Sequence, residues 1–295
     1  MIKENTKIIP LITNTMFEEV FGKEENKEML AYLISEYFEI EYEFVLENIV
    51  HQNTSQNIDN IKDYKYDVDI ILNLNNEVII NTEMNKKFWI GLQNRNLAYI
   101  SKIFSNQYVS GKGREQFRTS KKHIQINFNN YNYPKDRGMS INRLKDIDTN
   151  EELTDIIEIH HVNLEVIKKN CYNKADEELT PIEKIVRCLV TTDINDMEKV
   201  VGEGMKSILD KVMELSSDEK LVGLYNKEEL AEAREYGIHL AGIKEGIKEG
   251  IEQGIQETKK QVVINMLKDN LDIVLISKYT NLSIEEIYEI KETLN

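Results

Sequence analysis

The feature that most constrains the fold of this chain is the segment of residues 65–87, KYDVDIILNLNNEVIINTEMNKK. Its two halves, residues 66–74 and 77–84, are rich in side chains such as Val and Ile that favour extended backbone. Between them, Asn75 and Asn76 form a turn signal, because asparagine tolerates left-handed backbone. The segment therefore predicts a β-hairpin, and the rest of the domain has to be built around it.

Helical and extended patterns alternate on both sides of this hairpin. A stripe of apolar residues predicts a helix over residues 17–38, broken near Gly22, and a second helix over residues 88–109. The predicted order is helix, three strands, helix, strand and strand. The strands outside the hairpin are expected at residues 47–51, 123–128 and 155–165.

Beyond the last predicted strand the chain is helical and acidic. Thr180 is a good helix start, because Pro181 follows it and Glu183 can close a capping box. Glycine then recurs every fourth residue from Gly242 to Gly254, and each glycine is followed by Ile. The chain is expected to divide into a first domain at residues 1–175, a helical extension at 176–235, and an Ile/Gly-repeat helix with a small helical module at 236–295.

The four-residue repeat, GIKEGIKEGIEQGIQE, needs a physical reason, because each glycine costs about 1 kcal/mol in a helix interior. Small residues at this spacing let two helices approach closely, an idea taken by analogy from membrane helices. A flexible linker that arose by tandem duplication explains the repeat equally well. The final segment, from Val262, resembles a helix-turn-helix, and its balanced to acidic charge favours association with a partner or a second copy over DNA binding.

Acidic residues gather on the predicted hairpin. Side chains alternate between the faces of a strand, so Asp67 and Asp69 share one face of the first strand. Glu83 and Asn85 likewise share one face of the second. A cation would relieve the repulsion between these carboxylates, and oxygen ligands suit Mg²⁺ or Mn²⁺, which could polarise a phosphodiester and activate water. The same spacing also fits solvent-facing residues of an edge hairpin, so both interpretations stay open at this point.

The net charge of −15 argues at first against a nucleic-acid partner. The charge is unevenly distributed, however, because residues 86–137 hold eleven Lys and Arg but only two acidic residues. A basic block within an acidic protein is a candidate phosphate-binding surface, although chance clustering on a solvated surface would look the same.

Simple counts disfavour other classes of protein. The two cysteines, Cys171 and Cys188, fit neither a zinc pattern nor a disulfide framework. No apolar run approaches the roughly 18 residues of a membrane span, and the first residues lack the apolar core of a secretion signal. The chain is therefore expected to be cytoplasmic and to have no membrane partner.

One combination of residues resembles a known family. Asp69 lies fourteen residues before Glu83, Asn85 completes an ExN motif, and Arg95 follows in the helical segment NRNLAYISKIFSNQ, upstream of the strand IQINF. This arrangement resembles the PD-(D/E)XK nuclease family transposases, which are close to the Rpn recombination-promoting nucleases. The resemblance covers residues 15–170, and the Ile/Gly repeat is also a feature of that family.

The resemblance implies an α/β, restriction-endonuclease-like core, in which a mixed β-sheet is flanked by helices, followed by an all-helical C-terminal region. It implies that Asp69 and Glu83 bind Mg²⁺ (or Mn²⁺), with Asp67 as the fallback ligand. The third motif position is Lys in the general pattern and often Gln in this family, but here it is Asn85. Asparagine is neutral and cannot supply the positive charge that Lys offers to the scissile phosphate.

The resemblance also implies where DNA would bind. The helix after the motif would lie beside the active site and contact DNA phosphates, which positions the duplex without reading its sequence. The predicted contacts are Lys86, Arg95, Lys102, Arg114 and Lys121.

The function implied is a Mg²⁺-dependent endonuclease that acts on double-stranded DNA in the transposition or recombination of mobile elements, with catalysis assigned to Asp69, Glu83 and Asn85. The alternative is a catalytically weakened nuclease fold that acts as a DNA-binding or protein-interaction module, and Asn85 is the feature that separates the two. Self-association through the C-terminal helical tail is a further expectation.

Overall fold

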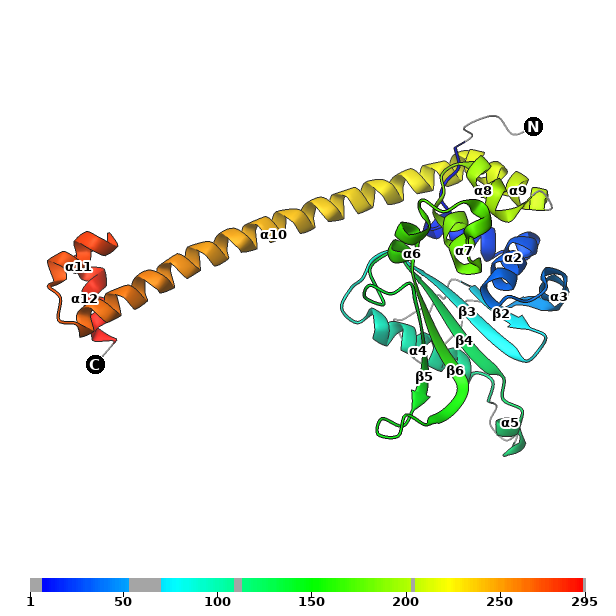
Figure 1. The fold of residues 1–295 in the computed structure, drawn as a ribbon, viewed down its shortest axis with the longest axis horizontal. Coiled ribbons are helices and arrows are strands. Elements are labelled where there is room, and N and C mark those ends of the chain that lie inside the picture. The colour runs from blue at the N-terminus through cyan, green and yellow to red at the C-terminus, as the bar shows by residue number, and fades with distance from the viewer. Residues whose placement is uncertain (1–6, 53–69, 109–112, 203–204, 294–295) are drawn as a thin grey trace. The chain divides into compact units, whose positions relative to one another are not determined.

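The structure, a computed structural model of the 295-residue chain, divides into two compact units, Met1–Asn226 and Lys227–Asn295. The first unit contains one six-stranded sheet with helices, and the second unit is helical (Figure 1). The structure describes residues 7–52, 70–108, 113–202 and 205–293.

One mixed sheet forms the frame of the first unit. Its strands lie in the order β1-β2-β3-β4-β6-β5, with β3, β4 and β6 parallel and the other neighbours antiparallel. The carboxyl ends of the three parallel strands therefore lie at one edge of the sheet. The strands are β1 (Ile49–Gln52), β2 (Ile70–Leu74), β3 (Val78–Asn85), β4 (Lys122–Asn129), β5 (Met139–Lys145) and β6 (Glu152–Asn163).

The hairpin that the sequence predicts joins β2 to β3. The Glu77 amide donates to the Leu74 carbonyl oxygen at 3.1 Å and closes the turn. Asn75 and Asn76 both have positive φ angles, 49° and 57°, as a type I′ turn requires. The hairpin is therefore confirmed from Ile70, the first described residue of β2, onward.

One face of the sheet carries the main hydrophobic core. The fully buried ring of Phe128 on β4 makes an edge-to-face contact with Phe17, whose ring centre lies 5.1 Å from that of Phe21. The helix predicted over residues 17–38 is two helices, because the chain breaks at Gly22 as expected. The N-terminal helices are α1 (Asn14–Phe21), α2 (Lys27–Phe38) and α3 (Tyr42–Asn48), with a 3₁₀ turn at Glu24–Asn26.

Four later helices pack into the same core. The predicted capping box is present at the start of α7, where the Thr180 amide donates to the Glu183 carboxylate at 3.0 Å. Ile185, Val186 and Leu189 of α7 are buried with the sheet residues, so this segment belongs to the first unit. The division of the chain at residues 175 and 235 stays a prediction. The helices are α6 (Leu164–Cys171), α7 (Pro181–Val190), α8 (Ile194–Val201) and α9 (Lys206–Ser217), with a 3₁₀ turn at Asp176–Glu178.

The opposite face of the sheet is covered by α4 (Leu92–Ser105), which packs on it through a small separate core of Ile71, Ile79 and Ile103. The sequence predicted this helix from residue 88, but it begins at Leu92. Gly91, directly before it, has a left-handed backbone with φ 102°, which a continuing helix cannot contain. A short helix, α5 (Glu115–Arg118), precedes β4.

The sequence analysis missed one strand, β5, which pairs antiparallel with β6 at the edge of the sheet. Most of its side chains are exposed, and its register shifts between Asn142 and Lys145. An exposed edge strand lacks the buried alternation by which strands are recognised in a sequence. The five-strand order expected from the sequence is therefore corrected to six.

The C-terminal elements are α10 (Glu219–Lys268), α11 (Ile273–Thr280) and α12 (Ile284–Glu292). The Gly/Ile repeat lies within the single helix α10, so the interpretation as a flexible linker is wrong. In the second unit, Val263, Ile276 and Ile287 from these three helices form a small core of their own. Among the described residues, no helix has both the length and the apolar character needed to cross a membrane.

The repeat glycines allow a first test. A Cβ atom at Gly242, Gly246, Gly250 or Gly254 would meet no heavy atom within 4 Å. Each Gly→Ala substitution is therefore expected to stabilise α10 by about 0.5–1 kcal/mol and to raise its unfolding midpoint in far-ultraviolet circular dichroism. Gly223→Ala, equally open within α10, is the matched control. A fall in stability for the repeat variants, with a rise for the control, would show that the repeat glycines sit against another helix in solution.

Candidate active site

The strand β3 divides its side chains between two environments. Ile80 belongs to the main core, whereas Ile79 packs beside Ile103 of α4. Because side chains alternate along a strand, Asn81, Glu83 and Asn85 share the face that α4 covers. All three are buried polar residues, and they approach the carboxyl end of the strand.

Glu83 brings a carboxylate into this buried layer, with only 2% of the residue exposed. Arg95 Nη2 lies 3.5 Å from Glu83 Oε2, and Asn81 Nδ2 donates to Glu83 Oε1 at 3.3 Å. A buried carboxylate is costly unless an opposite charge and hydrogen bonds compensate it. Arg95 and Asn81 provide both, so the Glu83 side chain is held in one position.

Arg95 joins α4 to the end of β3. Its Nη2 donates to Asn85 Oδ1 at 2.9 Å, and its guanidinium carbon lies 5.1 Å from the centre of the Tyr99 ring and 6.0 Å from that of Trp89. Aromatic rings at these distances attract a cation and favour one orientation of the guanidinium. Arg95 therefore brings a positive charge to the motif position where Asn85 has none.

A row of amides on β4 extends the polar layer. Asn127 Nδ2 donates to the His160 carbonyl oxygen at 3.0 Å, and Gln125 Nε2 donates to Asn127 Oδ1 at 2.9 Å. Asn81 Nδ2 lies 3.3 Å from Gln125 Oε1 and 3.3 Å from Glu83 Oε1. A backbone carbonyl can only accept, so each amide orientation is fixed by the one before it. The row therefore ends with an N–H directed at the Glu83 carboxylate.

Asn85 is held from the β4 side as well. Its Nδ2 donates to Asn129 Oδ1 at 3.2 Å, and the Tyr131 hydroxyl donates to the same oxygen at 3.1 Å. Asn129 Nδ2 lies 3.3 Å from His161 Nδ1. Burial, and secondarily the neighbouring His160, lowers the pKa of His161 to about 4. The His161 ring is therefore neutral near pH 7, and its Nδ1 can accept from Asn129.

The oxygen atoms of this layer suit a hard divalent cation. Asn81 Oδ1 is buried and has no hydrogen-bond partner within the described residues, and its side chain touches Glu83. Carboxylate and amide oxygens are ligands that Mg²⁺ accepts. The described part of the chain has no group of three His, Cys, Asp or Glu side chains that could hold a metal ion. The predicted ligands Asp69 and Asp67 lie outside the described residues, so Glu83 is the one predicted metal ligand with a described position.

Two of the predicted DNA contacts, Lys86 and Lys102, lie on or directly after the elements that form this polar layer. Lys86 directly follows Asn85 at the end of β3. Lys102 lies on α4 seven residues after Arg95, which is two turns or about 10 Å along the helix axis.

The other two predicted contacts lie at the opposite end of the sheet (Figure 1). Lys121 comes just before β4 and its Nζ bonds to Asn76 in the hairpin turn, while Arg114 comes just before α5. The β3–β4 ladder pairs Val78 with Lys122 and Asn85 with Asn129, so the level of Lys121 lies eight residues, or about 26 Å, from that of Asn85. These two residues are not brought together with Glu83, and their role as DNA contacts stays a prediction.

The sequence analysis did not single out the amides that support Glu83, which are Asn81, Gln125, Asn127 and Asn129. A signal for them exists, because polar residues occupy every second position of both strands, in the patterns NTEMN and QINFN. In the structure both faces of β4 are buried, and Gln125 and Asn127 have no exposed surface.

Comparison with known proteins gives one match. The family model of the PD-(D/E)XK nuclease family transposases matches residues 11–241, which include the whole sheet and α4. No curated protein and no solved structure matches the chain significantly.

The amide row makes a prediction about stability. Asn127→Leu keeps the side-chain size but leaves Gln125 Nε2 buried without its acceptor. An unsatisfied buried donor costs about 1–3 kcal/mol, so the free energy of unfolding in urea should fall by that amount. Asn170→Leu, at an exposed position on α6, is the control and should change it by less than about 0.5 kcal/mol. Equal effects of the two variants would show that the row does not support the site.

Proposed function

The chain belongs to the PD-(D/E)XK nuclease family transposases, and from this premise we propose that it is a Mg²⁺-dependent endonuclease that hydrolyses phosphodiester bonds in double-stranded DNA. The observation that carries the proposal is the buried Glu83 carboxylate, 2% exposed, held by Arg95 and an amide row near the carboxyl end of β3. Buried and compensated ionisable groups of this kind concentrate at functional sites. Transposition or recombination of mobile elements is the proposed setting, as for the Rpn nucleases.

Asp69 is proposed as the partner of Glu83 in holding the metal ion, with Asp67 as the fallback. Ile70 at the start of β2 pairs with Thr82 of β3. In the sequence, Asp69 directly precedes Ile70 and Glu83 directly follows Thr82, so both acidic residues adjoin this described pair. Carboxylate oxygens suit Mg²⁺, which supports a common cation as the proposal.

Bound Mg²⁺, or Mn²⁺, would supply a Lewis acid for the phosphodiester and lower the pKa of a bound water. The protein's own contribution is to keep Glu83 fixed, through the Asn81 N–H on one oxygen and Arg95 beside the other. Asn85, held between Arg95 and Asn129, can orient a water molecule by hydrogen bonding.

Arg95 is proposed to replace the cation that the general motif carries on the strand. Negative charge develops on the phosphate oxygens during attack, and a fixed cation stabilises it more than a neutral amide does. Arg95 Nη2 lies 2.9 Å from Asn85 Oδ1 and 3.5 Å from Glu83 Oε2, so the guanidinium is already next to the third motif position. The helix thus supplies a charge that a strand lysine would otherwise supply.

Removal of the carboxylate tests the nuclease proposal. Glu83→Gln keeps the side-chain shape but removes the negative charge, so nicking of supercoiled plasmid with Mg²⁺ or Mn²⁺ should fall by at least about 100-fold. Asp69→Asn should have a similar effect. Asp148→Asn, an exposed acid in the turn before β6, is the control and should cut normally. Cleavage by Glu83→Gln at the control's rate would exclude this site.

A charge exchange tests the role of Arg95. Arg95→Gln should lower cleavage by about 10- to 100-fold, because the guanidinium that donates to Asn85 would be lost. Adding Asn85→Lys to Arg95→Gln should restore part of the activity, measured by the same nicking assay. Asn85→Lys alone should not raise it, because the new lysine would meet Arg95 and two like charges repel each other. Full activity of Arg95→Gln would show that this guanidinium is not the catalytic cation.

The second candidate function rests on Asn85. A neutral residue at the third motif position fits a catalytically weakened nuclease fold that binds DNA or another protein. Duplex binding without nicking in Mg²⁺ and in Mn²⁺, by the wild type and by Asn85→Gln alike, would favour that function.

A second copy of this chain is the proposed partner of α10. Ile243, Ile247, Ile251 and Ile255 follow one another at four-residue spacing and remain about half exposed. Exposed apolar side chains in a regular row are typical of a surface that associates. Sedimentation of the full-length chain, compared with a variant in which these four residues are Ser, measures this directly.

A further inference from the structure

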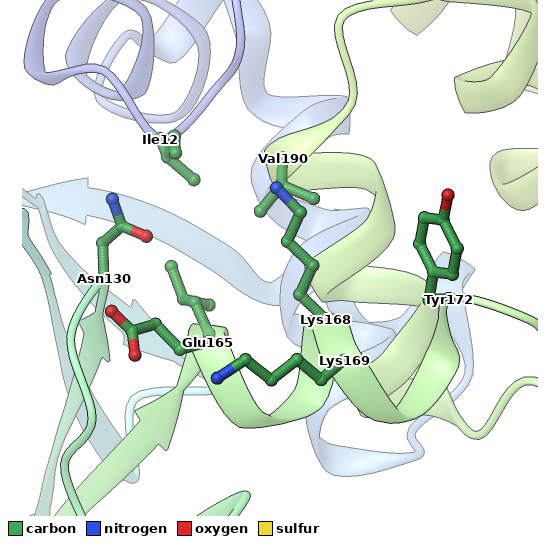
Figure 2. A pocket seen from close by; sticks show the side chains of 8 residues that line it. Ile12, Asn130, Glu165, Lys168, Lys169, Tyr172 and Val190 are labelled. Carbon is green, nitrogen blue, oxygen red and sulfur yellow. The ribbon is translucent and has the colours of Figure 1, made fainter.

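A pocket with a volume of about 600 Å³ lies in the first unit, along α6 (Figure 2). Figure 2 shows Glu165, Lys168 and Lys169 of α6 and Tyr172 directly after it, while Ile12 comes from a separate segment. A pocket of this volume is large enough for a ligand of the size of a nucleotide. Leu164, Val190 and Asn130 complete the lining.

The charges of this pocket point to an anionic ligand. Lys168 and Lys169 are exposed neighbours on α6, and neither has an ion pair within the described residues. The chain as a whole carries a net charge of −15, and other lysines of this unit, such as Lys174 with Glu183, are paired. Within the described residues these two lysines form no ion pair and outnumber the one carboxylate that lines the pocket, Glu165, so their ammonium groups can bind phosphate oxygens.

The remaining side chains of the pocket suit the base and the sugar of a nucleotide. Tyr172 lines the pocket and is 77% exposed, so its ring can stack on a base. Leu164 and Val190 provide an apolar wall. The amide of Asn130 can donate to or accept from sugar hydroxyls, and the carboxylate of Glu165 can accept from sugar hydroxyls and base amino groups.

The pocket is connected to the candidate active site through β4. Asn130 follows the last residue of β4, and its backbone amide donates to the Asn85 carbonyl oxygen at 2.8 Å. Leu164 and Glu165 directly follow the end of β6. The pocket therefore opens at the carboxyl edge of the parallel strands, where sheets of this kind bind their ligands.

We propose that this pocket binds a nucleotide, with the phosphate on Lys168 and Lys169 and the base against Tyr172. The choice of a nucleotide over other anions rests on the proposed nuclease function. Two sources offer the same chemistry. One is a nucleotide unit of a DNA strand bound at the candidate active site, and the other is a free mononucleotide.

Calorimetric titration of the full-length chain with deoxyadenosine monophosphate tests the proposal, with deoxyadenosine and inorganic phosphate as partial ligands and EDTA present. The nucleotide should bind more tightly than either partial ligand. Lys168→Gln with Lys169→Gln should weaken nucleotide binding by at least about tenfold, because two charge-assisted contacts are lost. Tyr172→Ala should weaken it, whereas Tyr172→Phe should keep it. Lys199→Gln with Lys206→Gln, at exposed positions of the same unit, removes the same charge and should have no effect.

Several outcomes would overturn the proposal. They are no binding of the nucleotide, equal affinity of the Lys168/Lys169 variant and its control, or loss of binding in Glu83→Gln. The last outcome would locate the nucleotide at Glu83 instead. Because no metal and no cleavage enter this measurement, it can succeed or fail independently of the nuclease assay.

Binding of a labelled DNA duplex by the same variants shows whether the nucleotide in the pocket comes from DNA or from a free mononucleotide. If the pocket takes a nucleotide of the DNA strand, the Lys168/Lys169 variant binds duplex more weakly and the mononucleotide competes with DNA. If the ligand is a free nucleotide, duplex affinity is unchanged in the variant.

Discussion

The burial of the Glu83 carboxylate determines the composition of the whole face of the sheet that α4 covers. The effective penalty for taking such an ion out of water is several kcal/mol, and it is offset only when neighbouring groups supply charge and N–H donors. The residues around Glu83 supply this charge and these donors. Arg95 comes from α4, Asn81 donates from the same strand, and the facing positions of β4 hold Gln125 and Asn127 where a buried parallel strand would normally hold apolar residues. The amides fix one another's orientation, so the polar layer behaves as one unit around one charge.

The other face of the sheet explains how the fold can sustain such a layer. Phe128, Ile126 and Ile124 of β4 point into the main core, which includes residues from α1, α2 and α7. On the α4 side, the buried apolar cluster formed by described residues consists of Ile71, Ile79 and Ile103. Stability therefore resides mainly on one face and the candidate chemistry on the other. A change of side chain at position 85 would alter the polar layer but would leave the main core intact, because Asn85 does not belong to that core.

The sequence predicted those features that depend on local backbone chemistry. The Asn75–Asn76 turn, the capping box at Thr180 and the break at Gly22 each follow from the residues at that point, and each is present in the structure. The strand β5 was missed because its pairing with β6 is a tertiary contact that leaves its side chains exposed. The support of Glu83 by β4 was missed for a related reason. Parallel pairing brings together residues about forty positions apart, such as Asn81 and Gln125, and no local pattern encodes their register. Of the predicted site residues, Glu83, Asn85 and Arg95 come together, whereas Asp69 lies outside the described residues.

The proposed placement of the catalytic cation on a helix, instead of on the strand, changes which contacts the site depends on. A lysine two residues after Glu83 would be positioned by the sheet itself. Arg95 is positioned by α4, which rests on the small cluster of Ile71, Ile79 and Ile103, and by the ring of Tyr99 on the same helix. A small shift of α4 would therefore move the guanidinium relative to Glu83 while the sheet stayed unchanged. Asn85 counteracts such a shift, because its Oδ1 accepts from Arg95 while its Nδ2 donates to Asn129 on β4. Asn85 thus holds the Arg95 guanidinium of the helix in a fixed position relative to the Glu83 carboxylate of the strand.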